Sequence, residues 1–220
     1  EADYILSIFT KDFGKITALA KNAKKSSKRF GGRLEPFVLS RISFQDKPGR
    51  MHMLQECETI KVFSTFMEDV ELFTLGSFMI ENIEILVPKE DPTEKTFKLF
   101  LNTLKVLNTR KNILPEILKF QLSVLALSGF MPKLDSCTKC GKVVSQKAIF
   151  SIKKGGFLCQ NCSSNKSNGY LLSRDFLINT DSMQADPKMI FRYIDIFRKF
   201  TEYYTGKEIK SFKILQEFRQ

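Results

Sequence analysis

The sequence predicts an α+β protein in which a small N-terminal β-barrel precedes a helical domain with an inserted four-cysteine metal module. Three observations support this: alternating, turn-separated segments over residues 4–58, helical periodicity after residue 60, and two Cys-x-x-Cys pairs near the middle of the second half. A chain of 220 residues is long enough for two domains. We expect the barrel over 1–60, the helical domain over 61–220, and the module over 135–165.

Four N-terminal stretches have the alternating or β-branched pattern of strands. They are "YILSIFT", "KITALAKNA", "RLEPFVLSRISFQD" and "MHMLQECET", separated by the turn-rich clusters "KDFG", "KKSSKRFGG" and "DKPGR". Several short strands joined by basic loops fit a small barrel better than a parallel α/β sheet.

The helical prediction rests on three amphipathic stretches in the second part of the chain. In "DPTEKTFKLFLNTLKVLN", Asp91 can cap the helix and Pro92 can stand at its first position. "LPEILKFQLSVLALSGF" begins near Pro115 and ends at Gly129, and "DPKMIFRYIDIFRKFTEYYTG" has the same plan. The apolar run "LFTLGSFMIENIEILV" contains acidic residues, so we expect no membrane span. "SSNKSNG" is expected to be a mobile loop.

Cys137, Cys140, Cys159 and Cys162 follow the spacing C-x2-C-x18-C-x2-C. Two intervening residues let both thiolates of a pair reach one ion from a tight turn. The stretch "IFSIKKGGFL" reads as two short strands around a Gly-Gly turn that brings the second pair back to the first. Four thiolates select tetrahedral Zn2+, so the sequence predicts one bound zinc ion.

This zinc is expected to be structural. Four cysteines saturate the ion, whereas hydrolytic zinc keeps an open position for water. A redox role would need a Cys-x-x-Cys in a βαβ setting, and none is visible. The one histidine, His52, is expected at the surface, and the fifth cysteine, Cys57, is expected to be a small buried apolar residue.

The formal charge of +11 favours a polyanionic partner. Residues 11–33 hold eight basic residues against one acid, and the interleaved Phe13 and Phe30 add rings on which single-strand bases could stack. A solubilising charged loop is the alternative. The predicted DNA-contacting residues are Lys11, Lys15, Lys21, Lys24, Lys25, Lys28, Arg29, Arg33 and Arg41.

No enzymatic motif accompanies this basic stretch. "KKGG" at 153–156 lacks the P-loop frame, and no Ser/His/Asp constellation or metal-binding carboxylate pattern is visible. The sequence therefore predicts a binding protein and not an enzyme. A reducing, cytoplasmic setting is the default expectation, and in that setting clustered Cys pairs bind metal more often than they form disulfides. Binding to DNA would associate the protein with the nucleoid.

Four stretches, in this order along the chain, resemble the RecO family of bacterial DNA repair proteins. They are "EADYILSIFTKDFGKITALAKNAKKSSKRFGGRLEPF", "ALSGFMPKLDSCTKCGK", "FSIKKGGFLCQNC" and "YTGKEIKSFKILQEF". The resemblance implies an OB-fold barrel, a helical domain and, on these cysteines, a zinc module. Family members usually have a further strand before "EADYILSIFT", so the barrel is expected to lack its first strand.

The resemblance also implies function and partners. The family binds single- and double-stranded DNA, anneals complementary strands and, with RecR, helps RecA replace single-strand-binding protein. The helical domain is then expected to bind the acidic, Phe-ending tail of single-strand-binding protein, with Arg192, Arg198 and Lys199 as candidate contacts.

A zinc-ribbon adaptor or transcription-type protein remains the alternative to a recombination mediator. In that case the cysteine module itself would contact nucleic acid through its own lysines. These are Lys139, Lys142, Lys147, Lys153 and Lys154.

Overall fold

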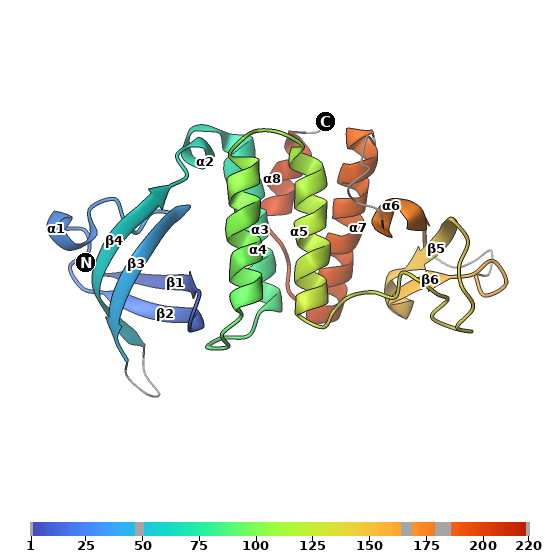
Figure 1. Ribbon diagram of the computed structural model, residues 1–220, viewed down its shortest axis with the longest axis horizontal. Coiled ribbons are helices and arrows are strands. Elements are labelled where there is room, and N and C mark those ends of the chain that lie inside the picture. The colour runs from blue at the N-terminus through green and yellow to red at the C-terminus, as the bar shows by residue number, and fades with distance from the viewer. Residues whose placement is uncertain (1, 47–50, 164–168, 179–185, 219–220) are drawn as a thin grey trace.

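The computed structural model describes residues 2–46, 51–163, 169–178 and 186–218. The side chains of Ser27, Lys28 and Ile178 are not described, so the prediction for Lys28 lies outside the described part, as does most of the predicted loop 163–169. A β-domain lies at one end of an elongated molecule, upright helices fill its middle, and the cysteine module lies at the other end (Figure 1). The predicted α+β fold is confirmed.

The N-terminal sheet has the strand order β1-β2-β4-β3. Its strands are β1 (Tyr4–Thr10), β2 (Gly14–Ala20), β3 (Val38–Gln45) and β4 (His52–Val62), and the four-residue helix α1 (Ser27–Phe30) lies between β2 and β3. Alternation turns Ala18 and Ala20 of β2 inward against Leu54 and Cys57 of β4, so the barrel has a small apolar core of its own. Cys57 is buried, as predicted.

The middle of the molecule is a bundle in which α3 packs on α5 and α8, and α5 packs on α4 and α7. The three predicted amphipathic helices are present, whereas α2, α3 and α8 were not predicted. Asp186 caps α7 as expected by accepting from the Lys188 N–H, but Thr93, not Asp91, precedes the first residue of α4. The helices are α2 (Thr65–Glu68), α3 (Val70–Leu86), α4 (Glu94–Leu107), α5 (Ile113–Leu127), α7 (Pro187–Thr205) and α8 (Ser211–Glu217).

The cysteine module contains a second, three-stranded sheet in the order β6-β5-β7. Phe150 of this sheet packs against Phe197 and Phe200 of α7, with ring centroids 5.5 and 5.9 Å apart. The module therefore shares one continuous core with the helices. Its elements are β5 (Lys147–Ser151), the 3-10 turn η1 (Ile152–Lys154), β6 (Gly156–Leu158), β7 (Tyr170–Ser173) and the helix α6 (Arg174–Ile178), the last two unpredicted.

Aromatic side chains dock the barrel onto the bundle. Phe37 stacks on Phe66 at 4.9 Å and lies directly over Gly76, where a Cβ would come within 2.5 Å of the ring. Phe9 of β1 contacts Phe97 of α4, with centroids 5.7 Å apart. Apolar burial at these contacts fixes the barrel against α3 and α4.

Two sequence expectations about the barrel are wrong. His52 is buried, with 9% of its surface exposed, because it alternates with Leu54 on the inward side of β4 and lies edge-on to Phe44. Phe30 is 2% exposed and belongs to the barrel core, so its ring is not available for base stacking.

No described helix is both long and apolar enough to cross a bilayer.

Candidate metal centre and nucleic-acid interface

The four predicted ligand cysteines converge at one point of the module. The sulfur atoms of Cys137, Cys140, Cys159 and Cys162 all lie within 4.8 Å of one another. Each pair forms a tight turn: the Gly141 N–H donates to the Cys137 carbonyl at 2.9 Å, and the Cys162 N–H donates to the Cys159 carbonyl at 2.9 Å. The prediction that these cysteines come together is confirmed, and the cluster can hold a metal ion.

The donor set fits a tetrahedral thiolate site. Zn–S bonds of about 2.3 Å place tetrahedral sulfurs roughly 3.8 Å apart, and the Sγ atoms of Cys140 and Cys159 are 3.6 Å apart. Burial disfavours the Cys137 thiolate, but N–H groups of Cys159, Cys140 and Lys139 aimed at its sulfur outweigh this and lower its pKa to about 6. Hydrogen bonds from the Cys162 thiol to Cys159 and Cys140 raise the pKa of Cys162 to about 12. Four thiolates so close together need a cation.

The turn 152–156 joins the cluster to the rest of the fold. The Phe157 N–H donates to the Lys133 carbonyl at 3.0 Å, and the Lys133 N–H donates to the Gly155 carbonyl at 2.9 Å. Gly156 has φ of 156°, and a Cβ there would lie 2.3 Å from the Lys133 carbonyl oxygen. Only glycine allows this close approach, so the Gly-Gly pair fixes the return of the second cysteine pair.

Lys15 must be removed from the predicted DNA-contacting set, because its ammonium is buried. Its side chain is 5% exposed, donates to the Glu84 carbonyl at 2.6 Å, and lies 3.5 Å from the Glu84 carboxylate. Glu84 is in the last turn of α3, where carbonyls lack helical partners and a cation is favourable. Burial lowers the Lys15 pKa, against the opposing effect of Glu84. Lys15 therefore docks the barrel onto the bundle.

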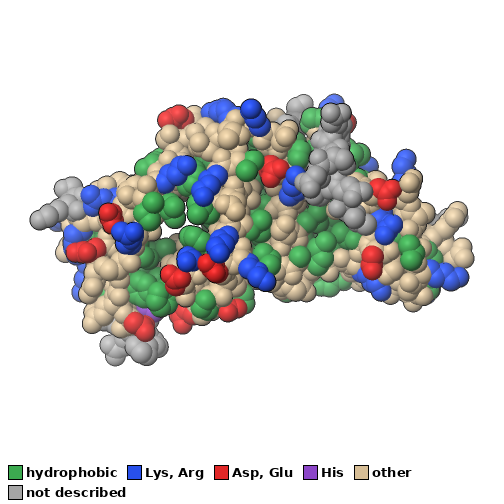
Figure 2. Space-filling view, in the orientation of Figure 1, with side chains coloured by type: hydrophobic (Ala, Val, Ile, Leu, Met, Phe, Trp, Pro, Cys, Tyr) green, Lys and Arg blue, Asp and Glu red, His purple; other side chains and the backbone are tan. Residues whose placement is uncertain are grey.

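The remaining cations of the stretch gather around the far end of β2. Lys21, Lys24, Lys25 and Arg29 are exposed. Arg29 donates to the Lys21 carbonyl at 3.0 Å and to the Ser26 hydroxyl at 3.1 Å, which orients its guanidinium. An open groove of about 510 Å³ lies beside them, lined by Lys21, Arg29, Ser43, Met53, Leu54, Gln55 and Glu56. The space-filling view shows Lys and Arg side chains at this end of the molecule, interspersed with acidic ones (Figure 2).

Three further residues of the predicted DNA-contacting set do not line this groove. Arg41 is exposed on β3 and pairs with Glu58 at 3.1 Å, and Lys11 pairs with Glu94 at 3.4 Å. Both pairs are solvent-exposed and therefore weak enough to exchange for a phosphate. Arg33 is half-buried. Phe13 is 55% exposed, although one edge of its ring packs against Phe44.

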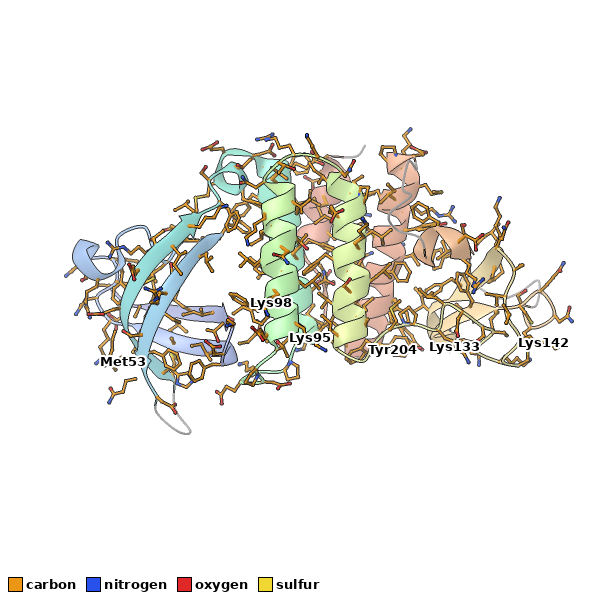
Figure 3. The ribbon with its side chains drawn as sticks, in the orientation of Figure 1. Met53, Lys95, Lys98, Lys133, Lys142 and Tyr204 are labelled. Carbon is orange, nitrogen blue, oxygen red and sulfur yellow. The ribbon has the colours of Figure 1, made fainter. Side chains whose placement is uncertain are left out.

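Sequence reasoning missed the uncharged part of the groove. Ser43, Met53 and Gln55 lie on neighbouring strands β3 and β4 and face the same groove as Lys21. The alternation of β4 could have placed Met53 and Gln55 together, but nothing in their residue types indicates nucleic acid. Figure 3 labels Met53 on the outer part of the barrel.

The candidate tail-binding residues of α7 differ in availability. Arg198 is 15% exposed, donates to Asp195 and Glu202, and lies 4.8 Å over the Phe212 ring, so it stabilises the bundle. Lys199 pairs with Asp195 at 2.7 Å. Arg192 is exposed and forms no ion pair with a described residue.

Comparison with known proteins shows the family. Residues 1–63 match the family description "Recombination protein O N terminal", and residues 67–178 match "Recombination protein O C terminal". The chain is 32% identical over 236 residues to the DNA repair protein RecO of Desulfatibacillum aliphaticivorans, which covers 99% of this chain and 92% of that protein. It is 27% identical over 217 residues to the RecO protein of Myxococcus xanthus (strain DK1622), covering 96% and 89% respectively.

An OB-fold domain, a helical bundle and a four-cysteine cluster that can hold a metal ion, together with these matches, place the chain in a class of DNA repair proteins. The chain belongs to the RecO family.

Proposed function

We propose that the protein is a non-enzymatic recombination mediator: it binds single- and double-stranded DNA through its barrel and promotes annealing of complementary strands. The observation that carries this is the group of exposed cations beside the groove on the barrel, Lys21, Lys24, Lys25 and Arg29. Lysine and arginine contact backbone phosphates without reading sequence, as an annealing protein requires. Family membership favours this role over a transcription-type adaptor.

The proposal divides the work between the domains. Residues 1–60 form the DNA-binding domain, residues 61–220 the helical domain, and residues 135–165 the inserted module. The module holds one structural Zn2+ on its four cysteines. The helical domain binds RecR and the acidic tail of single-strand-binding protein, and of the three candidate cations on α7 only Arg192 is exposed, whereas Arg198 and Lys199 are half-buried. Together these contacts help RecA to load on coated DNA, in the cytoplasm at the nucleoid.

Charge reversal tests the DNA surface. About six phosphate contacts predict that log affinity for single strands falls with log salt at a slope near −4. Lys24→Glu with Lys25→Glu should reduce this slope in magnitude by about 1.4 and weaken binding at low salt. Lys105→Glu with Lys111→Glu, at the end of α4 and just beyond it, makes the same change of charge away from the barrel. Equal effects of the two pairs would mean that net charge alone attracts DNA.

Annealing is the activity to measure. Two complementary oligonucleotides, one coated with single-strand-binding protein, are mixed with and without the protein and without nucleotide. The proposal predicts acceleration, which Lys24→Glu with Lys25→Glu abolishes. Binding without acceleration would contradict the mediator role while leaving the DNA surface intact.

A further inference from the structure

The cysteine module has a second concentration of positive charge that the barrel site does not explain. Residues 131–163 contain six lysines against one acid, Asp135. This is a formal +5 with neutral thiols, and it remains +3 when four thiolates hold one Zn2+. All six lysines are exposed, and none forms an ion pair with any residue that the structure describes. They are Lys133, Lys139, Lys142, Lys147, Lys153 and Lys154.

Two exposed tyrosine rings lie next to this charge. Tyr203 and Tyr204, at the end of α7, are 54% and 41% exposed, and their rings meet edge to face at 5.2 Å. The Tyr204 hydroxyl donates to the Ile152 carbonyl at 3.0 Å and would lie 3.0 Å from a Cβ at Gly155. These contacts tie the rings to the turn that carries Lys153 and Lys154.

Backbone contacts of the turn 152–156 also bring Lys133 next to Lys153 and Lys154. Lys133 pairs with Gly156 through the backbone, so its side chain starts beside the same turn. In Figure 3, Tyr204, Lys133 and Lys142 follow one another from the end of α7 to the outer part of the module. Figure 2 shows basic side chains at this end as well as on the barrel.

We propose that this surface, formed by the module lysines with Tyr203 and Tyr204, is a second contact for single-stranded DNA. Exposed rings beside cations are the combination that holds unpaired bases, since the rings stack on bases and the cations contact phosphates. An acidic peptide would use the lysines but would not need the rings. The inference rests on the proposed function and deepens it.

The position of the surface gives the second contact a use. The barrel and the module lie at opposite ends of the molecule, with the bundle between them (Figure 1). One molecule therefore binds single strands at two separated places, so that two complementary strands, or two stretches of one strand, are held by the same protein. Such tethering raises the effective concentration of one strand near the other.

The sequence contains no tryptophan, so one introduced Trp reports on one surface. Tyr203→Trp places the reporter on the module surface. Tyr4→Trp places it on the barrel, where Tyr4 is 38% exposed and lies 5.6 Å from the Lys24 ammonium. Each full-length variant is titrated with a short oligo(dT) at low salt, and quenching of Trp fluorescence measures stacking at that surface.

We expect both reporters to be quenched. Quenching of Tyr203→Trp should persist with Lys24→Glu and Lys25→Glu, and Lys153→Glu with Lys154→Glu should weaken it at least tenfold while leaving the barrel reporter unchanged. The retained barrel response shows that the barrel of the charge-reversed protein is folded, and an unchanged thermal unfolding transition shows the same for the module, which shares its core with the helices.

Three outcomes would go against these expectations in distinguishable ways. An unquenched Tyr203→Trp, at oligonucleotide concentrations that saturate Tyr4→Trp, overturns the second surface. An unquenched Tyr4→Trp overturns the barrel assignment of the proposed function instead. Equal responses of Tyr203→Trp to oligo(dT) and to poly-glutamate would overturn the assignment to DNA in favour of an acidic protein partner.

Discussion

Replacing Cys159 with Ser tests whether the cysteine cluster stabilises the whole chain. The substitution removes one of four sulfurs that lie within 4.8 Å of one another. The module shares one apolar core with the helices through Phe150 and its contacts with α7, so loss of the metal should be felt beyond the module. We therefore expect metal loss and global destabilisation together.

The size of the effect follows from linkage. A ligand present at about 1,000 times its dissociation constant stabilises the native state by about 4 kcal/mol. In a chain of this length, 1 kcal/mol corresponds to roughly 2–4 °C in Tm. We expect Cys159→Ser to lose most of its zinc and to unfold about 8–16 °C lower than the wild type. Lowering the pH to about 5 should release zinc from the wild type, because the ligands must be thiolates.

The assay combines the zinc content per chain, by mass spectrometry, with calorimetric unfolding. Cys57→Ser is the matched control, since Cys57 is buried in the separate barrel core. It should keep its zinc even though burying a hydroxyl lowers its stability. One zinc ion per Cys159→Ser chain with an unchanged Tm would refute the argument. A loss of DNA binding at the barrel with unchanged stability would refute the structural role.

Further predictions concern the docking of the barrel and the turn in the module. Phe37→Ala should lower the free energy of unfolding in urea by about 3–5 kcal/mol, because a buried ring is lost. Phe37→Gly should cost about 1 kcal/mol less, because Phe37 has φ of 60° and glycine tolerates that backbone. A Gly variant less stable than the Ala variant would disprove backbone strain at this position. Lys15→Met should leave DNA affinity within about twofold. Burial lowers the folded-state pKa of Lys15, so at pH values between that pKa and 10.5 the unfolded chain binds more protons than the folded chain. The stability of the wild type should therefore rise with pH relative to that of Lys15→Met. The same pH dependence of stability in both proteins would show that Lys15 is not buried. Gly156→Ala should lower Tm by several degrees, since its Cβ would meet the Lys133 carbonyl oxygen; an unchanged Tm would contradict the close approach.

The parts of the fold that the sequence predicts are those determined by local spacing. The two Cys-x-x-Cys turns, and the helices around Leu104, Ile117 and Ile194, are visible because their periodicity arises within a single segment. The helix over 70–86 escaped prediction, because it packs against α5 and α8 and buries residues on several sides, which weakens its periodicity. The short β7 and α6 leave too few residues for any period to be read.

The site was predicted less completely than the fold, and β2 shows why. Inward positions alternate along this strand with outward ones such as Lys15 and Leu19, and Lys21 follows just beyond its end. Alternation correctly turns Lys15 away from the barrel interior. It cannot show that the last turn of α3, some seventy residues later in the chain, covers that part of the outer surface. The same face thus serves two purposes: around Lys15 it docks the bundle, and past Leu19 it opens into the groove beside Lys21. The surface that we propose for DNA begins where the helical domain stops covering the barrel, so its limit is set by domain packing and not by the local density of lysines.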